Sequence, residues 1–195
     1  MLGGRSERVV QQVLAACVAE LAESGYRGFR MDAVSAAAGV NKTSVYRRWP
    51  SKQQLVEAAV VWMRRFVHDV PLPDTGSLER DLVEAFRRKL SFKARVEGQA
   101  WARLLAEKHD LEVGVAIGGA VEERSRAWYK MVTRAIARGE LPAGTQPRLL
   151  LSMLAAIVDA WNASSAGKLK SGQLETAVRT VVAGARSGSL VRRQV

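Results

Sequence analysis

A short polar segment near the N-terminus carries the side chains best suited to recognition chemistry in this chain. Residues 41–48 read Asn-Lys-Thr-Ser-Val-Tyr-Arg-Arg, so short hydrogen-bonding groups come first and a tyrosine and two arginines follow. Short side chains at the start of a helix can reach base edges in a DNA major groove, whereas arginine and tyrosine can reach phosphates. This order favours a helix that enters the groove with its N-terminus first.

Two short helices joined by a tight turn would present this segment. The pattern predicts a helix from residue 31 or 32 to 38, a left-handed turn at Gly39, and a second helix at residues 42–49. Asn41 offers a side-chain cap for the second helix, and Pro50 ends it because the residue before a proline avoids the α region. The expected shared core consists of Val34, Ala38, Val40, Val45 and Trp49.

The whole chain has the composition of an almost entirely helical protein. Alanine, leucine, arginine and glutamate dominate its 195 residues, 48% of the residues are hydrophobic, and only five are prolines. These residue types favour helices over strands. We therefore expect an all-α fold of about nine helices. Besides the two short ones, they are predicted at about 6–24, 52–67, 77–93, 96–108, 111–138, 147–165 and 171–187.

One turn-rich segment divides the chain. Residues 71–77 read Pro-Leu-Pro-Asp-Thr-Gly-Ser, which interrupts the helical periodicity. We expect an N-terminal three-helix domain with a helix-turn-helix at residues 1–52, the helix at 52–67 as a connector, and a larger helical domain at 72–190.

The net charge of +11 fits a polyanionic partner, either nucleic acid or an anionic membrane surface. Its distribution adds little, because residues 1–52 carry eight Lys and Arg against four Asp and Glu, a net +4, and the other 143 residues carry a net +7. Charge alone therefore supports DNA binding only weakly.

Compartment signals point to the cytoplasm. The single cysteine, Cys17, excludes an intramolecular disulfide, fits a reducing compartment and is expected in the core. The first eight residues lack the apolar core of a signal peptide. The most apolar stretch, residues 149–163, is interrupted by Asp159 and is shorter than the roughly 20 residues of a membrane span. We expect no membrane partner.

Residues 37–52, Ala-Ala-Gly-Val-Asn-Lys-Thr-Ser-Val-Tyr-Arg-Arg-Trp-Pro-Ser-Lys, followed by Leu55-Val56, resemble the DNA-binding domain of the TetR family of bacterial transcriptional regulators. The resemblance is specific over about residues 8–60 and loose afterwards. It implies that Ser44 contacts a base and that Val45 and Trp49 lie in the core. The full set of predicted DNA contacts is Asn41, Lys42, Thr43, Ser44, Tyr46, Arg47, Arg48, Lys52 and Arg30, with Tyr46, Arg48 and Lys52 on phosphates.

One position departs from the family pattern. Members usually place threonine or serine at the position of Met31, where it caps the second helix and often touches a phosphate. Methionine can do neither. Either Asp32 caps the helix one residue late, or the cap is missing at a cost of ~1 kcal/mol. Arg30 would then replace the phosphate contact.

The resemblance also implies a homodimer and an inducer pocket in the C-terminal helices. The sequence permits the dimer, because residues 147–165 are apolar around most of the helix and residues 171–187 add a second apolar stripe. A cavity for a small hydrophobic or aromatic ligand would be lined by aromatic and apolar side chains. These same side chains could simply fill the core. The candidates are Trp101, Leu105, Trp128, Met131 and Trp161.

The function implied is a ligand-responsive repressor that binds a pseudo-palindromic operator as a dimer and is released by a small molecule. A non-induced or activating regulator is the alternative within DNA binding. An enzyme is disfavoured because we find no nucleophile–base pair, catalytic residue or cofactor loop. A metal site is not expected, because His68 and His109 are far apart in sequence. The basic face at 42–48 argues against an adaptor, whose grooves expose apolar stripes.

Overall fold

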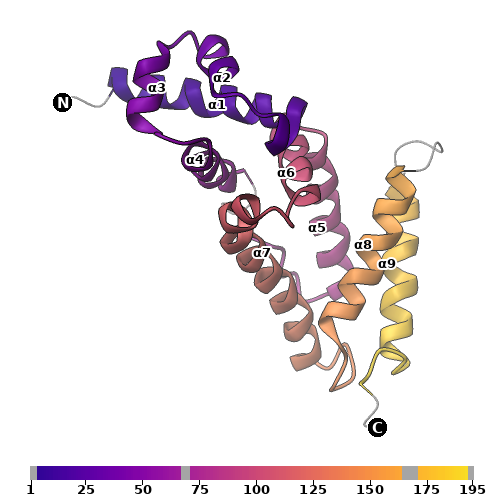
Figure 1. Ribbon diagram of the computed structural model, residues 1–195. Helices are drawn as coiled ribbons and strands as arrows, with labels where there is room; N and C mark the ends of the chain where they lie inside the picture. Colours follow the sequence, from indigo (N-terminus) through magenta and orange to yellow (C-terminus); the bar gives the residue numbers. More distant parts are fainter. Residues whose placement is uncertain (1–3, 67–70, 164–170, 193–195) are drawn as a thin grey trace. The chain divides into compact units, whose positions relative to one another are not determined.

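The computed structural model describes residues 4–66, 71–163 and 171–192, and this part is built from helices (Figure 1). An isolated antiparallel bridge between Thr145 and Val191 is the exception to the helical pattern there. The all-α prediction is confirmed. The helices are α1 (Gly4–Gly28), α2 (Met31–Ala37), α3 (Lys42–Arg48), α4 (Lys52–Arg64), α5 (Leu78–Lys93), α6 (Val96–Ala106), α7 (Leu111–Ala137), α8 (Pro147–Ala163) and α9 (Ser171–Arg186).

The predicted helices match these bounds to within a few residues. Predicted ends at 67 and 164–165, together with His68, lie outside the described residues. The first helix differs most, because α1 spans Gly4–Gly28 where about 6–24 was predicted. Gly25 has a non-helical backbone (φ 67°, ψ −176°), and one further turn follows it. Gly25 therefore marks a kink inside α1.

The described residues pack as two compact units. The first comprises residues 4–66 and 89–123, and the second comprises 71–88, 124–163 and 171–192. This division by packing is not the linear one expected from the turn-rich segment, because α6 lies along α1 in the first unit. The assignment of separate functions to residues 1–52 and 72–190 remains a prediction.

The first unit has a continuous apolar core beneath the two short helices. Cys17, Leu21, Leu55 and Leu104 are fully buried there, and Met63 is almost so. Burial of each large side chain contributes roughly 1.5–3 kcal/mol. Cys17 is in the core as predicted, and burial raises the pKa of its thiol. The buried side chains of the two short helices thus belong to one core with those of α1, α4 and α6.

The second unit contains most of α5, the second half of α7, and the pair α8 and α9, which pack against each other (Figure 1). Phe86 of α5 packs edge-to-face on Trp128 of α7, with ring centroids 5.0 Å apart. No described helix is long and apolar enough to cross a membrane. Within the same residues, no group of three or more His, Cys, Asp or Glu could hold a metal ion.

Candidate DNA-binding surface

The turn between α2 and α3 has the geometry expected of a helix-turn-helix. Gly39 adopts φ 64°, a left-handed conformation that glycine reaches without a Cβ clash. The Gly39 N–H donates to the Ala36 carbonyl at 3.1 Å, and the Val40 N–H donates to the Ser35 carbonyl at 3.0 Å. These bonds satisfy the last carbonyls of α2 and turn the chain toward α3.

Local capping fixes where α3 and α4 begin. The Asn41 Oδ1 accepts from the Thr43 N–H at 2.8 Å, and the Ser51 Oγ accepts from the Gln54 N–H at 3.2 Å. The predicted cap by Asn41 is confirmed. The Asn41 side chain is therefore engaged with its own helix, and it remains exposed at the helix start.

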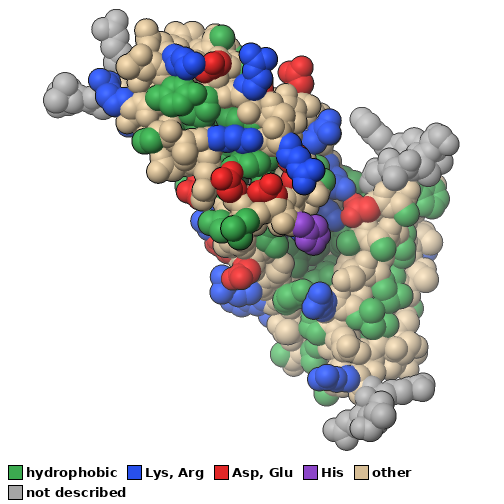
Figure 2. Space-filling model, viewed as in Figure 1, with side chains coloured by type: hydrophobic (Ala, Val, Ile, Leu, Met, Phe, Trp, Pro, Cys, Tyr) green, Lys and Arg blue, Asp and Glu red, His purple; other side chains and the backbone are tan. Residues whose placement is uncertain are grey.

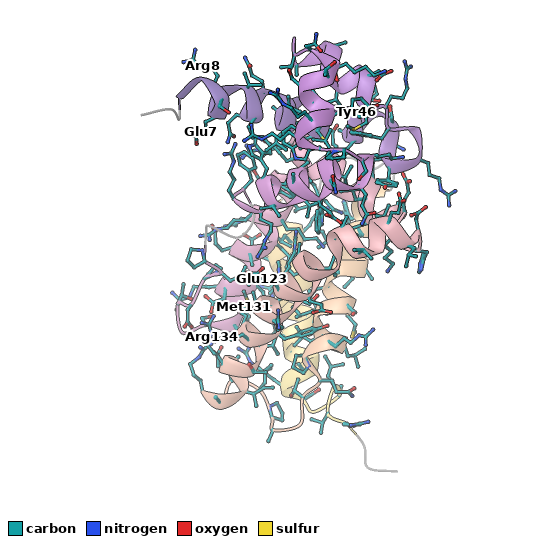
Figure 3. All side chains as sticks on the ribbon, turned by 60° about the vertical axis from the view of Figure 1, so that its left-hand side comes forward. Glu7, Arg8, Tyr46, Glu123, Met131 and Arg134 are labelled. Carbon is teal, nitrogen blue, oxygen red and sulfur yellow. The ribbon has the colours of Figure 1, made fainter. Side chains whose placement is uncertain are left out.

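A small apolar anchor holds α3 against the rest of the unit. Val45 and Val34 are fully buried, and Trp49 is nearly so, whereas Val40 and Ala38 are half-buried. Val34, Val45 and Trp49 are therefore confirmed as buried, and Ala38 and Val40 pack against the same core while partly exposed. The remaining side chains of α3 are exposed, and Tyr46 keeps 37% of its surface accessible as it extends from the helix (Figure 3).

Lys42 is held by its neighbours on this exposed face. Its Nζ lies 2.8 Å from Asp32 of α2 and 5.6 Å from the centre of the Tyr46 ring. The hydrogen bond to Asp32 raises the pKa of Lys42. Asp32 was considered as a helix cap, but its carboxylate is used in this ion pair instead.

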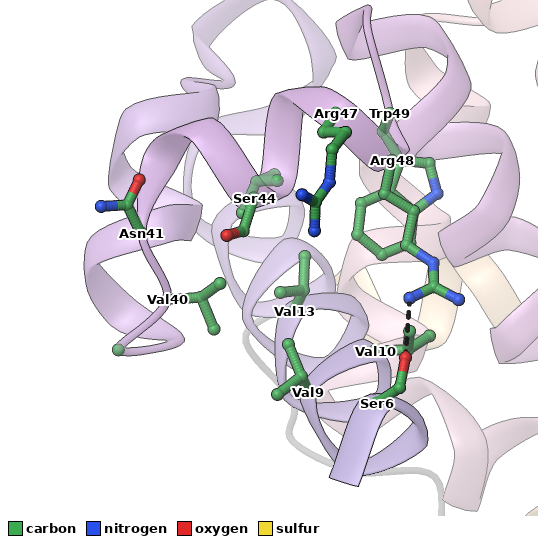
Figure 4. A pocket seen from close by; sticks show the side chains of 12 residues that line it. Ser6, Val9, Val10, Val13, Val40, Asn41, Ser44, Arg47, Arg48 and Trp49 are labelled. Atoms are coloured by element: carbon green, nitrogen blue, oxygen red, sulfur yellow. Dashed lines mark hydrogen bonds between the residues drawn. The ribbon is translucent and has the colours of Figure 1, made fainter. Parts of the chain in front are cut away.

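Arg48 is held on the opposite flank of α3. Its guanidinium donates to the Ser6 Oγ of α1 at 3.3 Å and lies 5.8 Å from the centre of the Trp49 ring (Figure 4). A groove of about 810 Å³ runs between the start of α1 and α3. Val9, Val10, Val13 and Val40 contribute its apolar side chains, and Ser44 and Arg47 line it as well.

Lys52 begins α4 and is tied to the end of α1. Its Nζ lies 4.0 Å from the centre of the Tyr26 ring. The Tyr26 hydroxyl donates to Glu112, and burial together with this carboxylate raises the pKa of Tyr26. Glu107 accepts from the Tyr26 N–H at 3.1 Å and from the Arg27 N–H at 2.9 Å. Sequence reasoning missed the contacts of Glu107 and Glu112, because 80 to 86 residues separate the partners.

The start of α2 corrects the prediction made for Met31. The N-cap residue is Arg30, and Met31 is the first helical residue and is buried. No side chain caps this helix, so the alternative with a missing cap is confirmed and the alternative with Asp32 as the cap is wrong. The Arg30 N–H donates instead to the Glu20 carboxylate of α1 at 3.2 Å. The Arg30 side chain is exposed at the start of α2 and stays a predicted DNA contact.

Charge is mixed over the molecular surface. Figure 2 shows Lys and Arg side chains interspersed with Asp and Glu on the face drawn there, without one continuous basic field. Geometry therefore identifies the surface better than net charge does. The decisive feature is an exposed polar face on a capped helix whose other face is anchored by Val45 and Trp49.

Comparison with known proteins decides the family. A sequence model described as "Bacterial regulatory proteins, tetR family" matches residues 13–59, and one described as "Tetracyclin repressor-like, C-terminal domain" matches residues 72–181. The chain belongs to the TetR family. It is accordingly a helix-turn-helix transcriptional regulator, and the TetR-family relatives that it matches are regulators rather than enzymes.

Three transcriptional regulators illustrate the range of similarity. The HTH-type transcriptional regulator AqdR of Rhodococcus erythropolis is 34% identical over 156 residues, which is 79% of this chain and 74% of AqdR. The DNA-binding transcriptional repressor TetR of Mycobacteroides abscessus is 28% identical over 152 residues, which is 75% of this chain and 77% of that repressor. Bacillus subtilis FadR, solved in complex with stearoyl-CoA, shares the fold with a TM-score of 0.64 at 18% identity. The match covers 91% of this chain and 98% of FadR.

The residues predicted to line a TetR-type ligand pocket lie in both units. Trp101 and Leu105 are half-buried against the core of the first unit. Trp128 lies on the second half of α7, as does the fully buried Met131 (Figure 3). Trp161 is 36% exposed on α8. The pocket therefore remains a prediction.

Proposed function

We propose that this TetR-family regulator is a cytoplasmic repressor that binds a pseudo-palindromic operator as a homodimer and is released by a small molecule. The observation that carries the proposal is the exposed polar face of α3, held by the buried Val45 and Trp49. Each α3 would read one half-site in the major groove, as helix-turn-helix dimers do.

Contacts to the DNA backbone would surround the reading helix. Tyr46 and Arg48 lie on the two flanks of α3, and Lys52 begins α4 with its amine beside an aromatic ring. The N-terminus of α4 adds backbone N–H groups and a positive dipole end that favour a phosphate. These groups fix the register of the helix on the duplex.

An apolar row on α8 supports dimerisation. Leu149, Met153, Ile157 and Trp161 recur every four residues, and each leaves between 36% and 41% of its surface exposed. Four large apolar side chains in one row are a surface that a second copy can bury. With α9 packed beside α8, two copies would form the four-helix interface that the sequence permits.

Arg124 of α7 indicates the chemistry of the ligand. It lies on the same side of α7 as the buried Met131 and Ala135, by helical spacing, and one turn before Trp128. It forms no hydrogen bond or ion pair with any described residue, whereas Arg134 and Arg138 both pair with Asp74. Burial lowers the pKa of Arg124. Because a desolvated cation favours a counter-ion, we propose a ligand with an apolar body and an acidic group.

The contacts of Glu107 and Glu112 offer a route for release. They join the segment between α6 and α7 to Tyr26, and Tyr26 lies beneath Lys52. A ligand that shifts this segment would move a phosphate contact and the start of α4 together. Release then requires a difference in ligand affinity between the DNA-bound and free conformations.

The test measures binding of the full-length protein to fluorescently labelled DNA from the region flanking its gene, by anisotropy at several salt concentrations. Arg48→Ala should lower the affinity for every fragment and reduce the salt slope by about one unit. Arg126→Ala, at an exposed site on α7, is the matched control and should bind normally. Unchanged binding by Arg48→Ala would contradict the docking described above.

Induction is tested on the same complex. A series of apolar carboxylic acids and their neutral amides is added at saturating concentration, and the DNA affinity is measured again. The proposal expects at least one acid, and not its amide, to lower the affinity. Equal DNA affinity throughout the series would contradict the proposal of an acidic apolar ligand, whereas the proposed DNA binding would still stand.

A further inference from the structure

The cations around the reading helix differ in whether neighbouring side chains hold them. Lys42 is paired with Asp32, Arg48 donates to Ser6, and Lys52 lies on the Tyr26 ring. Arg47 is exposed, and it forms no hydrogen bond, ion pair or ring contact with any described residue. Of these four, Arg47 is the one whose donors reach DNA without breaking an existing contact.

Helical geometry places Arg47 on the face that enters the groove most deeply. At 100° per residue, Arg47 lies about 160° around the helix from both Val45 and Trp49, the two residues that anchor α3. Arg48 lies only about 60° from Val45, and Tyr46 only about 60° from Trp49. The flanks of α3 therefore carry Arg48 and Tyr46, and the face opposite the core carries Arg47.

Ser44 lies between Arg47 and Arg48 around the helix, about 60° from Arg47. Ser44 and Arg47 are three positions apart, so their side chains are neighbours on the helix surface. Both line the groove beside Val13 and Val40, and Figure 4 shows the guanidinium and the hydroxyl next to each other. A free five-donor guanidinium and a short hydroxyl are thus presented together.

This arrangement separates positioning from reading. Groups on the flanks of a helix in the major groove face the two phosphate backbones, whereas the central face meets base edges. In the major groove, arginine pairs in bidentate fashion with the O6 and N7 acceptors of guanine, and the cytosine opposite offers no equivalent pair of acceptors. A guanidinium without intramolecular partners is free to adopt this geometry.

We infer that Arg47 reads a guanine in each operator half-site, assisted by Ser44, whereas Arg48 positions α3 on the phosphate backbone. The inference rests on the proposed operator binding and adds the base that the helix selects. Replacing that guanine should weaken binding by between about 5-fold and 150-fold, the range for one bidentate base contact.

The experiment selects operators from a randomised duplex pool with the full-length protein. Wild type, Arg47→Ala, Arg47→Lys and Arg48→Ala are compared, and circular dichroism checks that each variant is folded. Wild type should enrich a guanine at one symmetric position per half-site. Arg47→Ala should lose this preference and keep the others, and Arg48→Ala should keep it at lower affinity. Arg47→Lys should retain the preference partly, because an ammonium on a flexible stem lacks the planar donor fork of the guanidinium.

Two results would overturn the inference, and only the second would also contradict the proposed operator binding. If folded Arg47→Ala enriches the same bases as wild type at every position, Arg47 does not read a base, and operator binding stands. If wild type enriches no sequence at all, the proposed operator binding fails together with the inference.

Discussion

Gly25 and Glu107 should be energetically coupled. At Gly25 the backbone has φ 67° and ψ −176°, a region that other residues occupy at a cost of ~2 kcal/mol. A Cβ there would clash with the Glu107 Oε1. The carboxylate can swing away, but it then gives up its hydrogen bonds to the Tyr26 and Arg27 N–H groups. Bonds to a charged group at a half-buried site contribute about 1 kcal/mol each after solvent screening.

The magnitudes follow from these contacts. Glu107→Ala should destabilise the protein by ~2 kcal/mol through the two lost hydrogen bonds. Gly25→Ala should cost ~4 kcal/mol, the sum of the backbone strain and the same two bonds. The double variant should also cost ~4 kcal/mol and not ~6, because the bonds can be lost only once, which gives a coupling of ~2 kcal/mol.

Urea unfolding followed by tryptophan fluorescence measures the four free energies of the cycle. Gly39→Ala provides the matched control, because Gly39 also has a left-handed φ of 64° but a Cβ there would have no atom within 4 Å. The cycle of Gly39→Ala with Glu107→Ala should be additive. Additive values for Gly25→Ala with Glu107→Ala would refute the contact between the end of α6 and α1.

Three further predictions concern dimerisation, ligand charge and thiol reactivity. Ile157→Asp puts a charge in the exposed α8 row and should convert dimers to monomers in analytical ultracentrifugation; an unchanged dimer would exclude this face. Arg124→Gln should abolish the preference for acids over matched amides in the induction series; a retained preference would exclude Arg124. Cys17 should resist a disulfide reagent at pH 8 until urea unfolds the chain, because burial raises its thiol pKa and keeps the native thiol neutral. Rapid native reaction would contradict that burial.

Local signals explain why the helices could be predicted from sequence. The caps Asn41 and Ser51 and the left-handed Gly39 act within four residues of their partners, so their geometry can be inferred from the chain alone. Val45 and Trp49 were recognised as buried from their spacing and from the family resemblance. The exposed face of α3 follows from the same spacing.

Contacts distant in sequence could not be predicted in this way. Glu112 accepts from the Tyr26 hydroxyl, 86 residues away in the sequence. The turn-rich segment at residues 71–77 predicted a domain boundary, but it did not predict that α6 packs on α1 across that boundary. At α2 the family pattern was aligned one residue late, so the missing cap was assigned to Met31 although Arg30 is the N-cap.

Ligand-pocket residues raise a different difficulty. An aromatic side chain has the same sequence pattern whether it fills a core or lines a cavity, and Trp101 packs against the core of the first unit. Arg124 carries a clearer signal, since a charged residue within an apolar helical stripe requires a partner. A charged side chain within an apolar helical stripe, such as Arg124, is therefore more informative about a ligand than the apolar side chains around it.

Hydroxyl-radical footprinting of the full-length protein on its selected operator tests the central claim most directly. The account predicts two symmetric protected half-sites about one helical turn apart on one face of the duplex. Protection should be lost when Tyr46 and Arg48 are both replaced by alanine, and it should persist in Arg126→Ala. Undiminished protection by the double variant would contradict the assignment of the α3 face as the DNA-binding surface.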